Sequence, residues 1–238
     1  MAVIMMRLDK YLADMGIGTR TEVKKLIRQG KVSIDGEIIK SPEAKVDIQN
    51  SQVTCNGSPV CYEEFEYYML NKPAGVVSAT TDVKDKTVID LITDKKRKDL
   101  FPVGRLDKDT EGLLLITNNG ELAYRLLSPK KHVDKVYYAK IDGVVSKEDV
   151  EVFAKGIDIG EDEITQPSKL EILSSDDVSE IHLTIHEGKF HQVKRMFEAV
   201  GKKVIYLKRL SMGTLVLDDT LALGEYRRLT EEEVKSLC

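Results

Sequence analysis

The chain has 238 residues, of which 42% are hydrophobic and 32% charged, so it can bury a core and is not a disordered protein. That length allows one domain of ordinary size and one small domain. No apolar run approaches the roughly 18 residues that cross a membrane, the first residues lack the pattern of a signal peptide, and three cysteines without a CxxC pair argue against a disulfide framework or a zinc site and favour the reducing cytoplasm.

Charge is unevenly distributed along the chain. The net charge is −4, which by itself argues weakly against a nucleic-acid partner. Residues 7–31, however, carry seven Lys and Arg against three acidic residues, and residues 186–209 carry seven against two. Residues 147–180 carry eleven acidic residues against three basic ones. This segregation predicts one basic face and one acidic, solvated face, with lysines exposed only for solubility as the alternative for either basic cluster.

Residues 5–50 are predicted to form a small helix–helix–hairpin module. Apolar side chains recur at helical spacing in LDKYLADM, and a capping box from Thr19 to Glu22 begins a second helix in TEVKKLIRQ. KVSIDGEIIK follows as a strand, an Asp-Gly turn and a second strand. The order and wording of this stretch resemble the αL RNA-binding module of ribosomal small-subunit proteins and RNA-modifying enzymes. The resemblance implies an RNA-binding domain.

Basic side chains on this module are expected to contact RNA phosphates. Such contacts give salt-sensitive binding with little sequence content, which suits the shape and backbone of folded RNA. The residues are Arg7, Lys10, Arg20, Lys24, Lys25, Arg28 and Lys31.

The domain boundary is predicted near residues 60–66. Pro59 is expected to interrupt strand pairing, and the run EEFE reads as an acidic linker. We therefore expect domains at 1–62 and 63–238. Beyond the boundary, strand-like and helical patterns alternate irregularly, which favours an α+β fold over a doubly wound parallel sheet. Strands are predicted within 67–73, 75–81, 113–117, 136–145, 180–188 and 204–217, and helices within 146–156 and 189–201.

The stretch FPVGRLDKDTEGLLLITNNG, residues 101–120, is the most informative in the chain. Arg105 and Asp107 lie in a turn-rich loop before an apolar strand, and a charged pair on a loop anchored by rigid structure is typical of active sites. From spacing alone, a solvated salt-bridging loop is an equal alternative. The wording, however, resembles the signature of pseudouridine synthases of the RsuA family. This resemblance implies that Asp107 is the essential catalytic residue, and that Arg105 fills the vacated base stack or holds a flanking phosphate.

Two further segments carry residues that the resemblance places in the same site. In KVYYAKIDG, Tyr137 takes the place of the tyrosine that packs under the target base. In EGKFHQVKRMF, Lys194 aligns with the basic residue that pairs with the catalytic aspartate. On a helix over this segment Lys194 borders the apolar side, whereas Arg195 and His191 point away, so Arg195 is expected to meet the RNA backbone. The apolar stripe is expected to contain Phe190, Val193, Met196, Phe197 and Val200.

The resemblance implies a mixed, mostly antiparallel bent sheet with a cleft across it, and the isomerisation of uridine to pseudouridine in 16S rRNA. Uridine inside folded RNA must be flipped out before it can react. Asp107 then breaks the glycosidic bond, either by attack at the sugar or by removal of its 2′ proton. Because substrate and product are isomers, no cofactor is expected. No metal is expected either, since HExxxH at His186 is one residue longer than the metalloprotease pattern.

The expected partner is 16S rRNA or a small-subunit assembly intermediate, with no membrane, a monomeric state and a cytoplasmic location. A synthase acting on large-subunit 23S rRNA is the first alternative. A non-catalytic RNA-binding protein of ribosome assembly is the second. An intact set of Asp107, Arg105, Tyr137 and Lys194 counts against the second alternative, because binding alone does not need all four.

Overall fold

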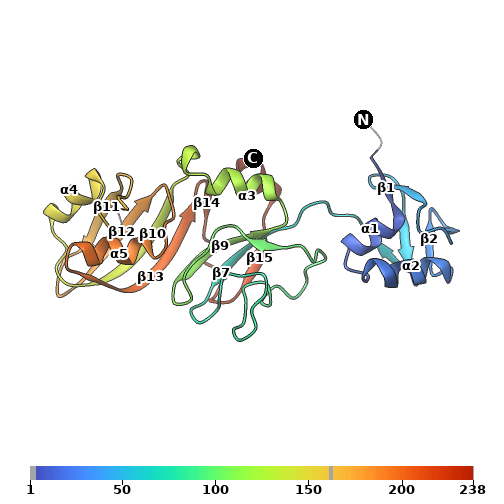
Figure 1. The fold of residues 1–238 in the computed structure, drawn as a ribbon, viewed down its shortest axis with the longest axis horizontal. Helices are drawn as coiled ribbons and strands as arrows, with labels where there is room; N and C mark the ends of the chain where they lie inside the picture. Colours follow the sequence, from blue (N-terminus) through green and yellow to red (C-terminus); the bar gives the residue numbers. More distant parts are fainter. Residues whose placement is uncertain (1–3, 161–162, 238) are drawn as a thin grey trace. The chain divides into compact units, whose positions relative to one another are not determined.

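The computed structural model describes residues 4–160 and 163–237 (Figure 1). It divides into two compact units. The first comprises the described residues up to Glu66 together with Asp94–Leu100, and the second comprises Tyr67–Thr93 and the described residues from Phe101 onward. The packing of residues 94–100 in the first unit was not predicted, because their local sequence does not indicate which distant residues they contact. A domain boundary at residue 62 stays a prediction.

The first unit has the predicted order of two helices and a hairpin. Thr19 caps the second helix through the predicted capping box with Glu22. The Asp-Gly turn is formed with positive φ at both Asp35 (50°) and Gly36 (87°), which is the conformation that a two-residue hairpin requires. The elements are β1 (Met5–Arg7), α1 (Leu8–Asp14), α2 (Arg20–Arg28), β2 (Val32–Ile34), β3 (Glu37–Ile38), β4 (Lys45–Asp47), β5 (Val53–Cys55) and β6 (Ser58–Val60).

Two details of the predicted linker are wrong. Pro59 does not interrupt pairing, because it lies in β6 opposite Thr54, and β6 is an edge strand of the four-stranded sheet β3-β2-β5-β6. An edge strand tolerates proline, since the missing N–H has no neighbour to bond. The run EEFE is not simply solvated either: Glu66 is 1% exposed, and its carboxylate accepts hydrogen bonds from the backbone N–H groups of Lys96 and Arg97. These bonds fasten 94–100 to the first unit.

The second unit is built on a nine-stranded sheet with the path β11-β12-β10-β13-β9-β7-β15. All of its pairs are antiparallel except β9 with β13, which confirms a mixed, mostly antiparallel sheet and an α+β fold. The elements are β7 (Tyr67–Lys72), β8 (Phe101–Pro102), β9 (Glu111–Thr117), α3 (Gly120–Leu127), η1 (Pro129–Lys131), β10 (Lys135–Asp142), α4 (Lys147–Lys155), β11 (Lys169–Ser174), β12 (Val178–Ile185), α5 (Gln192–Ala199), β13 (Lys203–Met212), β14 (Leu215–Val216), β15 (Tyr226–Arg228) and α6 (Glu231–Leu237).

The parallel contact between β9 and β13 joins two groups of antiparallel strands. It is short, with Arg209 opposite Gly112 and Lys208 opposite Glu111. Gly112 has φ of 98°, and a Cβ at this position would collide with the backbone of Arg209. Only glycine allows so close an approach. The loop that carries Asp107 ends directly before this junction, so its position is set by the sheet.

The segment 75–81, predicted as a strand, is a loop. Only Val77 pairs, in an isolated bridge with Thr87. The N–H of Ala79 turns back to the carbonyl of Val77, which is incompatible with an extended strand. The loop buries Val76 and Ser78 although it is not regular structure, so its apolar letters report burial and not strand formation.

The helix predicted over 189–201 is shorter than expected. It begins at Gln192, because His191 adopts the left-handed conformation with φ of 47° and ψ of 31°. Phe190 therefore lies outside the helix and is 75% exposed, so its predicted place in the apolar stripe is wrong. The prediction holds for Val193 and Met196, which are buried, as is Phe197. Figure 1 shows α5 beside the strands β10, β12 and β13.

Candidate active site

Asp107 lies in a cleft of about 710 Å³ within the second unit. A smaller hollow of about 70 Å³ shares part of its wall. A cleft of this size is typical of sites for small ligands or a single nucleotide. Three segments supply the residues that line both spaces: the loop between β8 and β9, the middle of β10, and the turn that leads into α5. The residues common to both are Arg105, Leu106, Asp107, Tyr137, Gly188, Lys189 and His191.

The loop of Asp107 is held by hydrogen bonds to its own backbone. Ser78 Oγ donates to the carbonyl of Leu106 at 2.8 Å and accepts from its N–H at 3.1 Å. The N–H of Thr110 returns to the carbonyl of Asp107 at 3.1 Å, which closes a turn around the carboxylate. Leu106 is buried beneath the loop. The aspartate is thus presented from a fixed backbone.

A buried lysine supports the same loop from below. Lys72 is fully buried, and its ammonium donates to the carbonyls of Thr110 at 2.8 Å, Pro73 at 3.0 Å and Lys108 at 3.3 Å. Burial lowers the pKa of Lys72 to about 8, against the opposing attraction of nearby carboxylates, of which Asp109 contributes most. One side chain therefore ties the end of β7 to both sides of the turn after Asp107.

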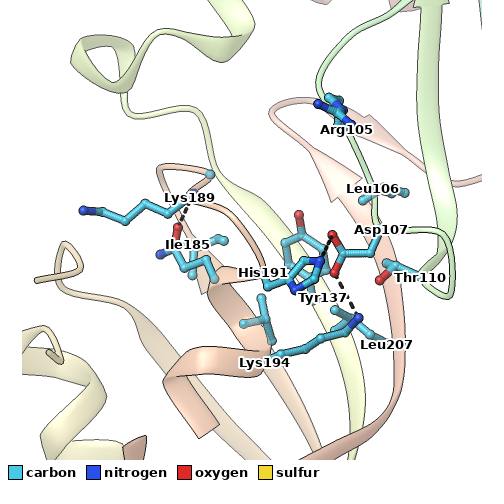
Figure 2. A pocket seen from close by; sticks show the side chains of 13 residues that line it. Arg105, Leu106, Asp107, Thr110, Tyr137, Ile185, Lys189, His191, Lys194 and Leu207 are labelled. Carbon is cyan, nitrogen blue, oxygen red and sulfur yellow. Dashed lines mark hydrogen bonds and ion pairs between the residues drawn. The ribbon is translucent and has the colours of Figure 1, made fainter. Parts of the chain in front are cut away.

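The carboxylate of Asp107 meets two groups from the α5 segment. Lys194 Nζ lies 3.0 Å from its Oδ2, and His191 Nε2 lies 3.6 Å from its Oδ1. Figure 2 shows both side chains reaching the carboxylate, with Tyr137 lining the same pocket. Lys194 also binds Asp109, at 2.6 Å to Oδ1 and 2.9 Å to Oδ2. Its ammonium therefore bridges two carboxylates of one loop.

These contacts have the expected electrostatic effects. Burial acts to lower the pKa of Lys194, but hydrogen bonds to Asp109 and Asp107 outweigh it and raise the pKa above its ordinary value. The same hydrogen bond from Lys194 lowers the pKa of Asp109. Lys194 is thus a cation at neutral pH, placed to stabilise negative charge on the loop.

Tyr137 contributes an aromatic ring to the wall of the cleft. It is 7% exposed, on the face of β10 opposite to that of Tyr138. A register shift between Val136 and Tyr137 interrupts the pairing of β10 with β13, and such bulges often re-aim a side chain beside an active site. Apolar side chains complete the wall around the ring, namely Ile185, Val193 and Leu207. A planar, weakly polar base fits such a surface.

The other predicted site residues of this unit lie in two different settings. Arg105 is exposed and lines both spaces, apart from the carboxylate of Asp107 (Figure 2). Arg195 does not line the cleft. Its guanidinium donates to the carbonyls of Ile159 at 3.0 Å and Gly160 at 3.1 Å, and it pairs with Glu163 at 2.7 Å. This geometry gives no support to the predicted RNA contact of Arg195.

In the first unit, most of the predicted RNA-contacting side chains are solvent-exposed. Arg7 forms a two-pronged pair with the buried Asp9, at 3.0 Å for each bond. Lys24 approaches the same carboxylate at 3.8 Å. The charges of Arg7 and Lys24 are therefore partly neutralised by Asp9 and are less available to RNA phosphates. The residues on the exposed surface are Lys10, Arg20, Lys25, Arg28 and Lys31.

Four residues in or beside the pocket were not predicted from the sequence, namely Asp109, His191, Lys72 and Thr110. Asp109 lies in the same short turn as Asp107, and that spacing could have suggested it. His191 was expected to point away, because the helix was expected to begin three residues too early. Lys72 has no local signal, since a lysine in a strand gives no sign that it will be buried. Thr110 also lines the hollow, and its hydroxyl has no hydrogen-bond partner among the described residues.

Within residues 4–160 and 163–237, no group of three or more His, Cys, Asp or Glu side chains is arranged to hold a metal ion. In the same part of the chain, no helix is long and apolar enough to cross a membrane.

A carboxylate in a cation-lined cleft, on a chain that also carries a small basic module, indicates an enzyme that acts on a nucleic acid. Comparison with known proteins identifies its family. Residues 66–199 match the family model of RNA pseudouridylate synthases, and residues 6–53 match that of the S4 domain. The chain belongs to the RNA pseudouridylate synthase family. It is an isomerase that converts uridine to pseudouridine, and it binds RNA.

Relatives match along almost the whole chain. The uncharacterized RNA pseudouridine synthase YtzG of Bacillus subtilis (strain 168) is 53% identical over 234 residues, covering 98% of each protein. The ribosomal small subunit pseudouridine synthase A of Vibrio cholerae serotype O1 is 43% identical, covering 98% of this chain and 99% of that protein. A crystal structure of a pseudouridylate synthase is 40% identical with a TM-score of 0.69, covering 98% of this chain and 100% of that one.

Proposed function

We propose that this enzyme isomerises a specific uridine of small-subunit 16S rRNA, with Asp107 as its catalytic residue. The observation that carries the proposal is the pairing of Asp107 with Lys194 at 3.0 Å, inside a cleft walled by Tyr137. Relatives named as ribosomal small subunit synthases match the chain over 98% of its length, which supports small-subunit 16S rRNA as the substrate over large-subunit 23S rRNA. The substrate is free 16S rRNA or a small-subunit assembly intermediate, and the enzyme acts as a cytoplasmic monomer.

The chemistry assigned to the cleft begins with a flipped uridine. Its base rests against Tyr137, and the apolar side chains of Val193 and Leu207 exclude water from it. Arg105, exposed at the edge, fills the vacated stack or holds a flanking phosphate. The cost of unstacking is offset by these contacts, which a nucleotide still inside the duplex cannot make.

Asp107 then breaks the N1–C1′ bond, by attack at C1′ or by removal of the 2′ proton. The detached uracil turns within the cleft and C5 bonds to C1′, which releases the carboxylate of Asp107 from C1′ in the first route and is accompanied by return of the proton to C2′ in the second. The proton on C5 leaves and N1 gains one, so the product is an isomer and no cofactor is consumed. Lys194 stabilises the negative charge of the Asp107 carboxylate before the bond breaks, and its ammonium stays beside the carboxylate while that charge decreases during the reaction.

Pseudouridine mapping in cells tests the proposal. Cells lacking the enzyme should lose a pseudouridine in 16S rRNA, and wild-type protein should restore it. The Asp107→Asn variant should not restore it, because an amide is neither a nucleophile nor a base at neutral pH. The turnover of this variant should fall by about a thousandfold or more. Asp109→Asn is the matched control, since it lies in the same loop and binds the same lysine. Loss of a pseudouridine in 23S rRNA instead would show that the substrate is large-subunit rRNA.

A further inference from the structure

Two aromatic rings stand stacked at the edge of the cleft. The ring centroids of Phe190 and His191 are 3.8 Å apart with an angle of 18° between their planes. Both residues line the cleft of about 710 Å³ that holds Asp107. Phe190 is 75% exposed, so its ring is accessible to a ligand that enters the cleft. The catalytic pairing of Asp107 with Lys194 makes no use of Phe190.

The backbone that presents these rings is fixed, although its conformation is unfavourable. His191 is left-handed with φ of 47°, which is uncommon for a residue with a side chain. Such a conformation persists only where the surroundings determine it. Here Gln192, which is 4% exposed, accepts from the N–H of Lys189 at 2.8 Å and donates to Glu187 at 3.0 Å. An aromatic ring held rigidly in solvent is preorganised for a partner.

The charges around the rings indicate what that partner is. The charged groups lining the larger cleft are one carboxylate, Asp107, and five cations. Those cations are Arg105, Lys108, Lys135, Lys189 and Arg209. Arg105 and Lys108 are exposed and Lys189 is half-buried, whereas Lys135 and Arg209 lie buried in the wall. A cationic edge of this kind suits phosphates and bases better than a hydrophobic protein surface. Single-stranded nucleic acid is bound in this way, by cations along its backbone and by aromatic rings under its bases.

We infer that the stacked rings of Phe190 and His191 form a stacking platform for the RNA base next to the target uridine. His191 Nε2 lies 3.6 Å from Asp107, so the inner ring already borders the space of the target nucleotide. The outer ring, Phe190, is then left for the neighbouring base. The inference rests on the proposed function, because it takes RNA as the occupant of the cleft. Stacking of this kind tolerates any base, since every base has a π-face.

Fluorescence of a stacked base analogue tests the platform without any need for turnover. The probe is a short oligouridylate with one 2-aminopurine, whose emission is quenched when it stacks on an aromatic ring. Wild-type protein should quench it. Phe190→Ala should lose most of the quenching and bind the probe about 10- to 100-fold more weakly, the range that one base–aromatic stack contributes. Phe190→Tyr should retain both properties within about twofold, because the ring is kept.

Leu173→Ala is the matched control, since Leu173 is a 46% exposed apolar residue on β11 that does not line the cleft. It should leave quenching and affinity unchanged. Equal quenching by wild type and Phe190→Ala, or none by wild type, would overturn the platform. Failure of wild type to isomerise 16S rRNA would overturn the proposed function instead. Asp107→Asn separates the two, because it should lose turnover and keep the quenching.

Discussion

Lys194 Nζ lies 3.0 Å from Asp107 Oδ2, although the two residues come from distant parts of the chain. The sheet brings them together. Lys194 lies on α5, which packs on β13, and β13 pairs in parallel with the first residues of β9, directly after the loop of Asp107. Gly112 permits that pairing to be close. The ion pair is thus a consequence of the topology, and substitutions that test it can be chosen to leave the topology intact.

Replacement of Lys194 and of Arg195 should have different effects. Lys194→Ala removes a charged hydrogen-bonding partner of Asp107, which costs about 1.5–3 kcal/mol, so the single-turnover rate should fall by about 10- to 100-fold. Arg195→Ala removes bonds to the carbonyls of Ile159 and Gly160 and should mainly lower the melting temperature. A larger rate loss in Arg195→Ala, at a temperature where both variants are folded, would assign the catalytic pairing to Arg195.

Asp109→Asn should cost far less than Asp107→Asn. Asp109 is 71% exposed and lines neither space of the site, so its contribution is to hold Lys194 and not to meet substrate. An exposed ion pair contributes at most about 1 kcal/mol, which corresponds to less than about a tenfold loss of rate. Single-turnover kinetics of the two variants with one RNA preparation make the comparison. Equal losses would mean that the two carboxylates act as one unit.

Lys72→Met should alter how stability depends on pH. The pKa of Lys72 is lowered from 10.5 to about 8 in the folded protein. Between these values the unfolded chain binds the proton and the folded chain does not, so the free energy of unfolding rises with pH. The rise is at most about 1.4 kcal/mol per pH unit and is absent in Lys72→Met. Urea unfolding across this window measures it. Lys235→Met, which changes a lysine with a 75% exposed side chain, should keep the wild-type profile.

The same substitution should also reduce activity. Without the ammonium of Lys72, the carbonyls of Thr110 and Lys108 lose their donor and the turn after Asp107 loses its support. Small displacements of a catalytic group can cost about a hundredfold in rate. We therefore expect a lower single-turnover rate with little change in RNA affinity. An unchanged rate would show that Ser78 alone positions the loop.

Local patterns in the sequence were sufficient for much of the fold. The capping box at Thr19, the Asp-Gly turn at Asp35 and the alternation along β12 depend on near neighbours, and each formed as predicted. The loop at 75–81 was mistaken for a strand because apolar residues signal burial in both settings. The start of α5 was placed too early because the left-handed His191 is imposed by Gln192 and Glu187, through contacts that no periodicity reports.

The candidate site shows the same division. Asp107, Tyr137 and Lys194 were placed together by resemblance to a family, and the structure brings all three to one pocket. Their roles stay predictions. Lys72 could not be found, because its burial depends on the approach of β7 to the loop before β9. The contacts of Arg195 with Ile159 and Glu163 were also beyond reach, since these two residues lie more than thirty residues earlier in the chain.

RNA binding by the first unit can be tested without cutting the chain. Removal of residues 1–60 would strip 94–100 of some of its packing partners, because a Cβ at Gly16 would already collide with the backbone of Lys96 and the ion pair of Arg97 with Asp14 would be lost. Neutralisation of charge avoids this difficulty. The proposed variant replaces the five exposed basic residues of the module by glutamine, namely Lys10, Arg20, Lys25, Arg28 and Lys31.

This five-glutamine variant should bind 16S rRNA more weakly and with less dependence on salt. If each residue contacts one phosphate, the slope of log K against log salt should become shallower by about three to four units, using the single-strand coefficient. The single-turnover rate at saturating RNA should change little, since Asp107, Tyr137 and Lys194 lie in the other unit. The control replaces three exposed lysines of the acidic segment 147–180 by glutamine, namely Lys147, Lys155 and Lys169, and should leave the slope unchanged. A wild-type slope in the five-glutamine variant would show that this surface does not contact RNA phosphates.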